Sequence, residues 1–170
     1  PLSAFFLVPV FLIGGLGCGY TLAAALAVLS RAARVVVGEL SPAVIAWNHG
    51  VLGALAGHPL RDRRVLVQQV DVIDQLRGDG AAFDLILLDV DNGPSALSQA
   101  RNAWLYREEG LAQVREKLQP GGVLGIWSAG PDARFVKRLR AQRFRVDERR
   151  VPAAGGRGKR HTLWIAKRTG

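Results

Sequence analysis

Short runs of apolar residues recur along the chain, separated by stretches in which apolar and polar positions follow a helical period. The apolar runs are bounded by glycine or by charged residues, which is typical of strands buried on both faces of a sheet. They predict five strands, over Val8–Ile13, Arg34–Gly38, Arg64–Gln68, Phe83–Leu88 and Val123–Trp127.

The segments between these runs predict helices. Ser41 and Pro42 supply a capping side chain and a proline at the first helical position, so we expect a helix from there to about Leu55. Further helices are expected over Tyr20–Arg31, Val72–Arg77, Glu108–Leu118 and Pro131–Gln142, with Ser95–Tyr106 helical in part.

Two more strands, Phe144–Val151 and His161–Ala166, are joined by a glycine-rich connection without a helix, which indicates an antiparallel pair. The order of elements therefore predicts an α/β fold with a doubly wound, mostly parallel seven-stranded sheet and an antiparallel C-terminal edge hairpin. No internal repeat or linker interrupts residues 1–170, so we expect a single nucleotide-binding domain.

Residues 1–30 carry no charged side chain and could be mistaken for a membrane span or a signal peptide. Pro9 and four glycines interrupt this stretch, however, and no basic segment precedes it. A buried strand, a glycine turn and a buried helix give the same hydropathy, so no membrane association is expected. The single cysteine, Cys18, excludes an intramolecular disulfide framework and is compatible with the cytoplasmic location that we expect.

Positive charge is concentrated near the C-terminus. From Arg134 onward there are 13 Lys and Arg against 2 Asp and Glu, within a chain of formal net charge +9. This pattern fits a solvated basic face, and it also fits a surface that attracts an acidic partner. Aromatic residues are not interleaved with the charge, so nucleic acid stays possible but is not favoured. The sequence leaves the oligomeric state open, a homodimer included.

A glycine-rich segment joins the first predicted strand to the first predicted helix, where a doubly wound sheet binds its ligands. It holds Gly14, Gly15, Gly17 and Gly19, and glycine lets a ligand approach the backbone closely. The helix that follows directs free N–H groups toward the same place. Glu39 ends the second strand, where a carboxylate can accept hydrogen bonds from both ribose hydroxyls. Together they predict a pocket for an adenosine-type cofactor.

The spacing of the glycines disfavours a dinucleotide without excluding it. Counted from Gly15, the third glycine comes one residue too early for the G-x-G-x-x-G fingerprint. Tyr20 occupies the position where that fingerprint has glycine or alanine for close packing of the helix on the strand.

Several stretches of the chain carry a resemblance to a known group of enzymes. They are Leu12–Gly19 (Leu-Ile-Gly-Gly-Leu-Gly-Cys-Gly), Val37–Pro42, Asp62–Val65 with Asp71, Phe83–Asp89 and Leu118–Leu124. In these stretches the chain resembles the class I S-adenosylmethionine-dependent methyltransferases, and within that superfamily the spermidine synthase-like proteins. The resemblance extends from about Val8 to Ala166.

The resemblance implies a nucleoside cofactor, S-adenosylmethionine or its decarboxylated form. Gly14 belongs to the matching loop, and Gly15, Gly17 and Gly19 would pass close to the amino-acid or aminopropyl portion of the cofactor. Glu39 would hold the ribose hydroxyls.

The same resemblance assigns the adenine to the residues that follow. Leu40 would pack on the ring, Asp71 would accept from the adenine amino group, and the backbone of Val72 would lie beside it. Read from the residues alone, Asp71 could equally cap the short helix that begins at Val72, and one carboxylate does not readily do both.

The fourth strand ends at Asp89, within Asp89-Val90-Asp91-Asn92-Gly93-Pro94. By resemblance, Asp89 would deprotonate or orient an attacking amine, with Asp91 as a second catalytic carboxylate and Asn92 near the substrate. Polyamine synthases usually have two aspartates three residues apart before the Gly-Pro pair, whereas here they are two apart. The segment from Asp91 could instead be a turn without a catalytic role.

Trp104 and Tyr106 are candidates for an aromatic wall beside the substrate, although both residue types are also common in cores. His58 and His161 lack partners at ligand spacing, so no metal site is expected. The small β-rich segment that precedes the core of full polyamine synthases is not visible in this sequence.

Four functions follow, and the first is our leading prediction. It is transfer of an aminopropyl group to a small-molecule amine by a spermidine synthase-like enzyme. The second is S-adenosylmethionine-dependent methylation of an unknown acceptor, and the third is non-catalytic binding of an adenosine cofactor. A dinucleotide oxidoreductase ranks last.

Overall fold

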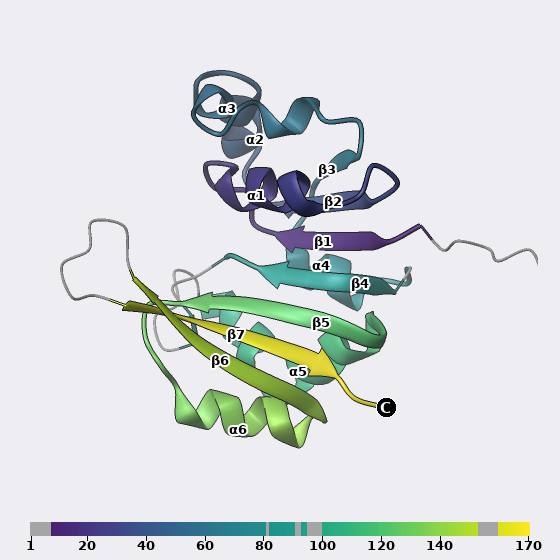
Figure 1. Cartoon of the computed structure of the whole chain (residues 1–170), viewed down its shortest axis with the longest axis vertical. Helices are drawn as coiled ribbons and strands as arrows, with labels where there is room; N and C mark the ends of the chain where they lie inside the picture. Colours follow the sequence, from purple (N-terminus) through teal and green to yellow (C-terminus); the bar gives the residue numbers. More distant parts are fainter. Residues whose placement is uncertain (1–7, 81, 91–92, 95–99, 153–159) are drawn as a thin grey trace, which may run out of the picture.

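The computed structural model describes residues 8–80, 82–90, 93–94, 100–152 and 160–170. Seven strands form one sheet in the order β3-β2-β1-β4-β5-β7-β6 (Figure 1). The strands are β1 (Val10–Gly14), β2 (Arg34–Glu39), β3 (Val65–Gln69), β4 (Phe83–Leu88), β5 (Leu118–Ser128), β6 (Phe144–Pro152) and β7 (Arg160–Arg168). The first five are parallel, and β7 is antiparallel to both β5 and β6. The predicted fold class is therefore confirmed.

Helical segments connect the strands and cover parts of both faces. They are α1 (Tyr20–Val28), α2 (Pro42–His49), α3 (Val51–Leu55), η1 (Pro59–Arg61), α4 (Val72–Arg77), η2 (Ala100–Tyr106), α5 (Glu108–Glu116) and α6 (Ala133–Ala141). In Figure 1, α1, α2 and α3 lie at the β1–β3 end of the sheet, and α6 lies at the β6–β7 end. Among the described residues, no helix is both long and apolar enough to cross a membrane.

Two groups of buried side chains hold these layers together. One includes Ile13, Leu22 and Val35 and joins α1 to the strands β1 and β2. The larger group lies on the other face, where Leu76 of α4, Leu111 of α5 and Leu139 of α6 pack on the sheet. Residues that alternate with this larger group along β4, β5 and β7 therefore face away from it, because successive strand residues point to opposite faces.

The predicted helix over Ser41–Leu55 is in fact two helices. Gly50 leaves the helical conformation, with φ −108° and ψ −117°, and separates α2 from α3. Beyond the break, the backbone of Gly53 lies close to that of Asn48: a Cβ at Gly53 would lie 2.1 Å from the carbonyl oxygen of Asn48. The prediction of a continuous helix was wrong because glycine makes this backbone approach possible.

The first predicted helix also ends early, at Val28, and Arg64 accounts for its end. The Arg64 guanidinium donates to the carbonyl oxygens of Leu26 (2.9 Å), Leu29 (2.8 Å) and Ser30 (3.2 Å). The carbonyl oxygens of Leu26 and Leu29 lie in the last turn of α1 and at its C-cap, where a helix leaves such oxygens without intrahelical partners. Asp62 in turn accepts from Arg64 and holds the guanidinium in place, at 2.8 Å to Oδ2.

The fifth strand is longer than predicted and begins at Leu118. We expected Pro120-Gly121-Gly122 to form a turn, but it lies within β5, where the register against β4 is irregular between Phe83 and Leu85. Proline in a sheet is found at such irregularities, and Gly121 adopts φ +79° there. The segment predicted as partly helical, Ser95–Tyr106, contains η2, while residues 95–99 lie outside the described residues.

Candidate functional site

Two pockets meet at the carboxyl edge of the sheet. The smaller, which we call the loop pocket, has a volume of about 230 Å³ and is lined by Gly15, Gly17, Gly38, Glu39, Leu40, Val70, Asp71, Val72, Asp89, Val90 and Asn102. The larger, which we call the apolar pocket, has a volume of about 660 Å³ and is lined by Thr21, Leu87, Leu88, Asp89, Val90, Gly125, Ile126, Trp127, Leu163, Trp164 and Ile165. Asp89 and Val90 line both pockets.

The segment Gly14–Gly19 between β1 and α1, which we call the glycine loop, contains four glycines, and the space around them differs from one to the next. Gly15 has φ +91°, and a Cβ there would lie 2.5 Å from the carbonyl oxygen of Asp89. Gly17 has φ +50°, and a Cβ there would meet nothing within 4 Å, so its backbone faces open space beside the loop pocket. Gly14 is packed against Val72, whose Cγ2 would lie 2.7 Å from an added Cβ. Gly17 is therefore the glycine whose backbone a ligand can approach most closely.

Asn48 on α2 holds this loop in position. Its side-chain nitrogen donates to the carbonyl oxygens of Gly17 (2.8 Å) and Val44 (2.9 Å), and the residue is buried. A Cβ at Gly19 would lie 2.9 Å from Asn48 Oδ1. No sequence motif marks Asn48, because its partner in the loop is a backbone atom 31 residues away.

Glu39 ends β2 and connects the loop to α2. Its Oε2 accepts from the backbone N–H of Leu16 at 2.9 Å, and its Oε1 accepts from that of Ser41 at 2.8 Å. Each carboxylate oxygen can accept two hydrogen bonds, so these contacts leave one position on each oxygen for a ligand hydroxyl. A carboxylate fixed in this way is positioned before any ligand binds.

Asp71 and the residues beside it form the far end of the loop pocket. Asp71 Oδ1 accepts from the backbone N–H of Ile73 at 2.8 Å, so this side chain caps α4, one of its two predicted roles. Its Oδ2 lies 3.2 Å from Nε of Arg101. Leu40 is half exposed in the same pocket, and Asn102 is buried there. The sequence did not single out Arg101 or Asn102, since no motif marks them.

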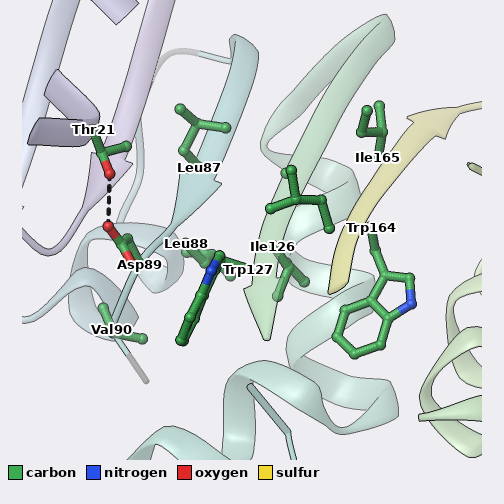
Figure 2. A pocket seen from close by; sticks show the side chains of 11 residues that line it. Thr21, Leu87, Leu88, Asp89, Val90, Ile126, Trp127, Trp164 and Ile165 are labelled. Carbon is green, nitrogen blue, oxygen red and sulfur yellow. Dashed lines mark hydrogen bonds between the residues drawn. The ribbon is translucent and has the colours of Figure 1, made fainter. Parts of the chain in front are cut away.

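Asp89 follows β4 and faces the first turn of α1. Its Oδ2 accepts from the hydroxyl of Thr21 at 2.7 Å, as Figure 2 shows. In the same view the indole of Trp127 lies between Val90 and Ile126. Thr21 fixes one oxygen of a carboxylate that borders both pockets, and sequence reasoning had not identified it.

The other predicted substrate residues are placed differently. Tyr106 is buried and packs edge-on against Phe135, with ring centroids 5.7 Å apart, while Trp104 lies under the guanidinium of Arg77 at 4.3 Å. Neither lines the loop pocket or the apolar pocket. Asp91 and Asn92 lie outside the described residues. Among the residues that the structure describes, no group of three or more His, Cys, Asp or Glu could hold a metal ion.

Comparison with known proteins identifies the fold. No protein-family profile matches the sequence, and no curated protein matches it either. Solved structures do match. A spermidine synthase in complex with the transition-state analogue AdoDATO is 19% identical over 94% of this chain and 52% of that chain, with a TM-score of 0.72. The spermidine synthase of Thermotoga maritima is 20% identical over 94% and 53%, with a TM-score of 0.74.

Human methyltransferase-like protein 13 in complex with SAH is 20% identical over 96% of this chain and 73% of that chain, with a TM-score of 0.72. The chain has the class I methyltransferase fold. It spans about half the length of the two spermidine synthases that it matches. At these identities the likeness shows the fold, and the activity has to be argued from the site.

Proposed function

We propose that this chain is a transferase that uses S-adenosylmethionine or decarboxylated S-adenosylmethionine and moves a group from its sulfonium to a small-molecule acceptor. The observation that carries the proposal is the position of Asp89, which borders both the loop pocket and the apolar pocket. A carboxylate at that point can act on an acceptor in one pocket while the donor occupies the other.

The residues of the loop pocket fit the nucleoside. Glu39 would hold the ribose hydroxyls with its two remaining acceptor positions, and Leu40 would pack on the adenine. Asp71 would accept from the adenine amino group, with Val72 beside the ring. Because Oδ1 of Asp71 caps α4, the adenine would have to use Oδ2, which it would share with or take over from Arg101. Gly17 would let the amino-acid or aminopropyl portion pass along the loop, because its backbone faces open space.

The proposed chemistry is displacement at a carbon next to the sulfonium. The bound nucleoside supplies that electrophilic carbon and departs as a neutral thioether. Asp89 accepts a proton from the acceptor amine, so that the amine attacks with its free electron pair. Thr21 holds Asp89 by one oxygen, which keeps the carboxylate oriented toward the acceptor.

Our leading form of the reaction is transfer of an aminopropyl group to an amine. The spermidine synthase structures support it through their fold, and Asp89 supports it through its position at the end of β4. Methyl transfer is the second candidate. It is favoured by the structure of a methyltransferase-like protein with SAH bound and by the apolar character of the larger pocket.

Substitution of Asp89 tests catalysis directly. Asp89→Asn keeps the shape of the side chain but cannot accept a proton, so we expect turnover to fall by about 100-fold or more. Binding of methylthioadenosine should change little. The measurement is release of methylthioadenosine from the decarboxylated cofactor, and of S-adenosylhomocysteine from S-adenosylmethionine, with 2-phenylethylamine or 1,4-diaminobutane as acceptor.

Asp84→Asn is the matched control, because Asp84 is an exposed aspartate at the start of β4, whereas Asp89 follows the end of that strand, and asparagine can still accept from the backbone N–H of Val10. It should keep its turnover. Thr21→Val should lower kcat without changing the dissociation constant of methylthioadenosine, and Thr21→Ser should restore kcat. Full turnover in Asp89→Asn would remove Asp89 from the mechanism. Binding without turnover in the unsubstituted chain would favour a non-catalytic binding protein.

A further inference from the structure

The apolar pocket lies on the same face of the sheet as α1, over the part of β4, β5 and β7 that no described helix covers, and Thr21 of α1 lines its edge. Its floor crosses three neighbouring strands, because Leu87 of β4 pairs with Gly125 of β5, and Gly125 pairs with Ile165 of β7. Two strand spacings make this floor about 10 Å wide. In Figure 1, α4 and α5 lie behind β4 and β5, while the opposite face of these strands is open.

Alternation along the strands explains why this face is apolar. Ile86, Leu124, Ile126 and Trp164 belong to the core on the helical side, so their strand neighbours Leu87, Gly125, Leu163 and Ile165 point to the open side. Ile165 is 38% exposed. Gly125 contributes no side chain, and the space that a Cβ would fill reaches to within 2.5 Å of Leu87 Cδ2. At the centre of the floor, the side chain of Leu87 therefore lies close over Gly125, and the aliphatic side chains of Leu163 and Ile165 line the floor beside it.

Polar groups are scarce in this pocket and gather at one end. Among its described lining residues, the polar side chains other than indoles are Asp89 and Thr21, which are hydrogen-bonded to each other. Asp89 is also the single carboxylate in that lining. A diamine would place its second ammonium over Leu87, Leu163 or Ile165, where the described lining offers no carboxylate. The carboxylate next to the lining, that of Asp147, is the cross-strand neighbour of Ile165 and is already paired with Arg149 at 2.9 Å. An unpaired charge in apolar surroundings is strongly disfavoured.

A volume of about 660 Å³ is in the range of small-molecule sites. The floor and the indole of Trp127 suit a hydrophobic body, and the polar end coincides with the wall shared with the loop pocket. An occupant with its polar group at Asp89 would extend its apolar part toward Ile165.

We propose that the apolar pocket is the acceptor site and that its acceptor is an apolar monoamine, an aliphatic or aromatic body with one amino group. This inference rests on the proposed function and narrows it, because it selects against the diamines that spermidine formation requires. The amine lies at Asp89 and the hydrophobic body covers Leu87, Gly125 and Ile165. It applies whether the transferred group is aminopropyl or methyl.

The test compares two amines on the chain saturated with methylthioadenosine. In calorimetric titrations, 2-phenylethylamine should bind at least tenfold more tightly than 1,4-diaminobutane. Tighter binding of the diamine would overturn the proposal.

Substitution at Ile165 sharpens the comparison. Ile165→Glu places a second carboxylate at the far end of the floor. It should therefore weaken the binding of 2-phenylethylamine at least tenfold and strengthen the binding of 1,4-diaminobutane. Ile165→Gln should weaken the binding of 2-phenylethylamine without strengthening the binding of 1,4-diaminobutane. Leu66→Glu is the control, since Leu66 is 56% exposed on β3, and it should change neither affinity.

Two other results would contradict the inference. If Ile165→Glu leaves both affinities unchanged, the acceptor does not lie on this floor. If the chain is a dimer by sedimentation velocity and Ile165→Glu makes it monomeric, the face belongs to a second copy. Failure of the proposed function is separable, because it appears as absent binding of methylthioadenosine, whereas both amine titrations can also be made without the nucleoside.

Discussion

The carboxylate of Glu39 has two tasks in this account, one within the chain and one toward a ligand. It accepts from the backbone N–H groups of Leu16 and Ser41, and so fixes the glycine loop against the start of α2. The same oxygens are the proposed partners of the ribose. A single side chain thus positions the loop and part of the ligand together.

Replacement of Glu39 should therefore weaken nucleoside binding. We expect Glu39→Ala to cost about 1.5–3 kcal/mol in the binding of methylthioadenosine, the range for a lost hydrogen bond to a charged group. Isothermal titration calorimetry measures this directly. Glu116→Ala removes an exposed carboxylate from α5 and serves as the control. An unchanged affinity in Glu39→Ala would mean that the ribose binds elsewhere.

Residue types and their order predicted much of the loop pocket. Gly15, Gly17, Glu39 and Asp71 could be found because each lies within four residues of the end of a predicted strand, and the structure places all four in one pocket. Thr21 and Asn48 could not be found in this way. Their partners, Asp89 and the carbonyl oxygen of Gly17, are distant in sequence, and only the folded chain brings them together.

At the scale of elements, the strands were the most predictable part, because a continuous apolar run between turn residues has few alternatives. The range Phe83–Leu88 was predicted with its observed bounds, as was the helix Val72–Arg77. The errors lie where the backbone departs from regular helix or strand geometry, which the periodicity of apolar side chains does not predict. Gly50 breaks a helix, and Pro120–Gly122 continue a strand through an irregular register.

The clamp between Asp62 and Arg64 joins α1 to the segment before β3. The side-chain hydrogen bond from Arg64, reinforced by its backbone N–H, lowers the pKa of Asp62 from 3.8 to about 2. A carboxyl whose pKa is lower in the folded state stabilises the fold above its unfolded pKa. That stabilisation is lost as the pH falls from about 4 toward 2.

We therefore expect Asp62→Asn to remove part of the acid sensitivity of the fold. The free energy of unfolding of the variant should fall less steeply between pH 4 and pH 2 than that of the parent, and the variant should be less stable at pH 7. Urea titrations at several pH values provide the measurement. Asp147→Asn, which removes an exposed carboxylate paired with Arg149, is the control. Parallel curves for Asp62→Asn and the parent would contradict the role assigned to the clamp.

For the molecule as a whole, the C-terminal positive charge is distributed over α6, β6 and β7, and part of it has a structural use. Arg138 donates to the carbonyl oxygen of Tyr106 at 3.0 Å, and Arg168 donates to that of Arg115 at 2.9 Å. These residues connect the last helix and the last strand to η2 and α5. Net charge alone therefore overstates how much of this region is available to an acidic partner.

The two halves of the proposed site differ in how they arise from the fold. The loop pocket is assembled from the ends of β1, β2 and β4 and from the start of α4, so the order of elements already determines it. The apolar pocket depends on which face of β4, β5 and β7 stays open, and this follows from the packing of the whole chain. Its acceptor chemistry could not be predicted before that packing was known.

The loop pocket is the proposed binding site for a sulfonium nucleoside. Calorimetric titration of the unsubstituted chain with S-adenosylmethionine, decarboxylated S-adenosylmethionine, methylthioadenosine and NAD under one set of conditions tests this directly. We expect saturable one-to-one binding of methylthioadenosine and of at least one sulfonium nucleoside, with much weaker binding of NAD. Tight binding of NAD alone, with none of the three others bound, would contradict it.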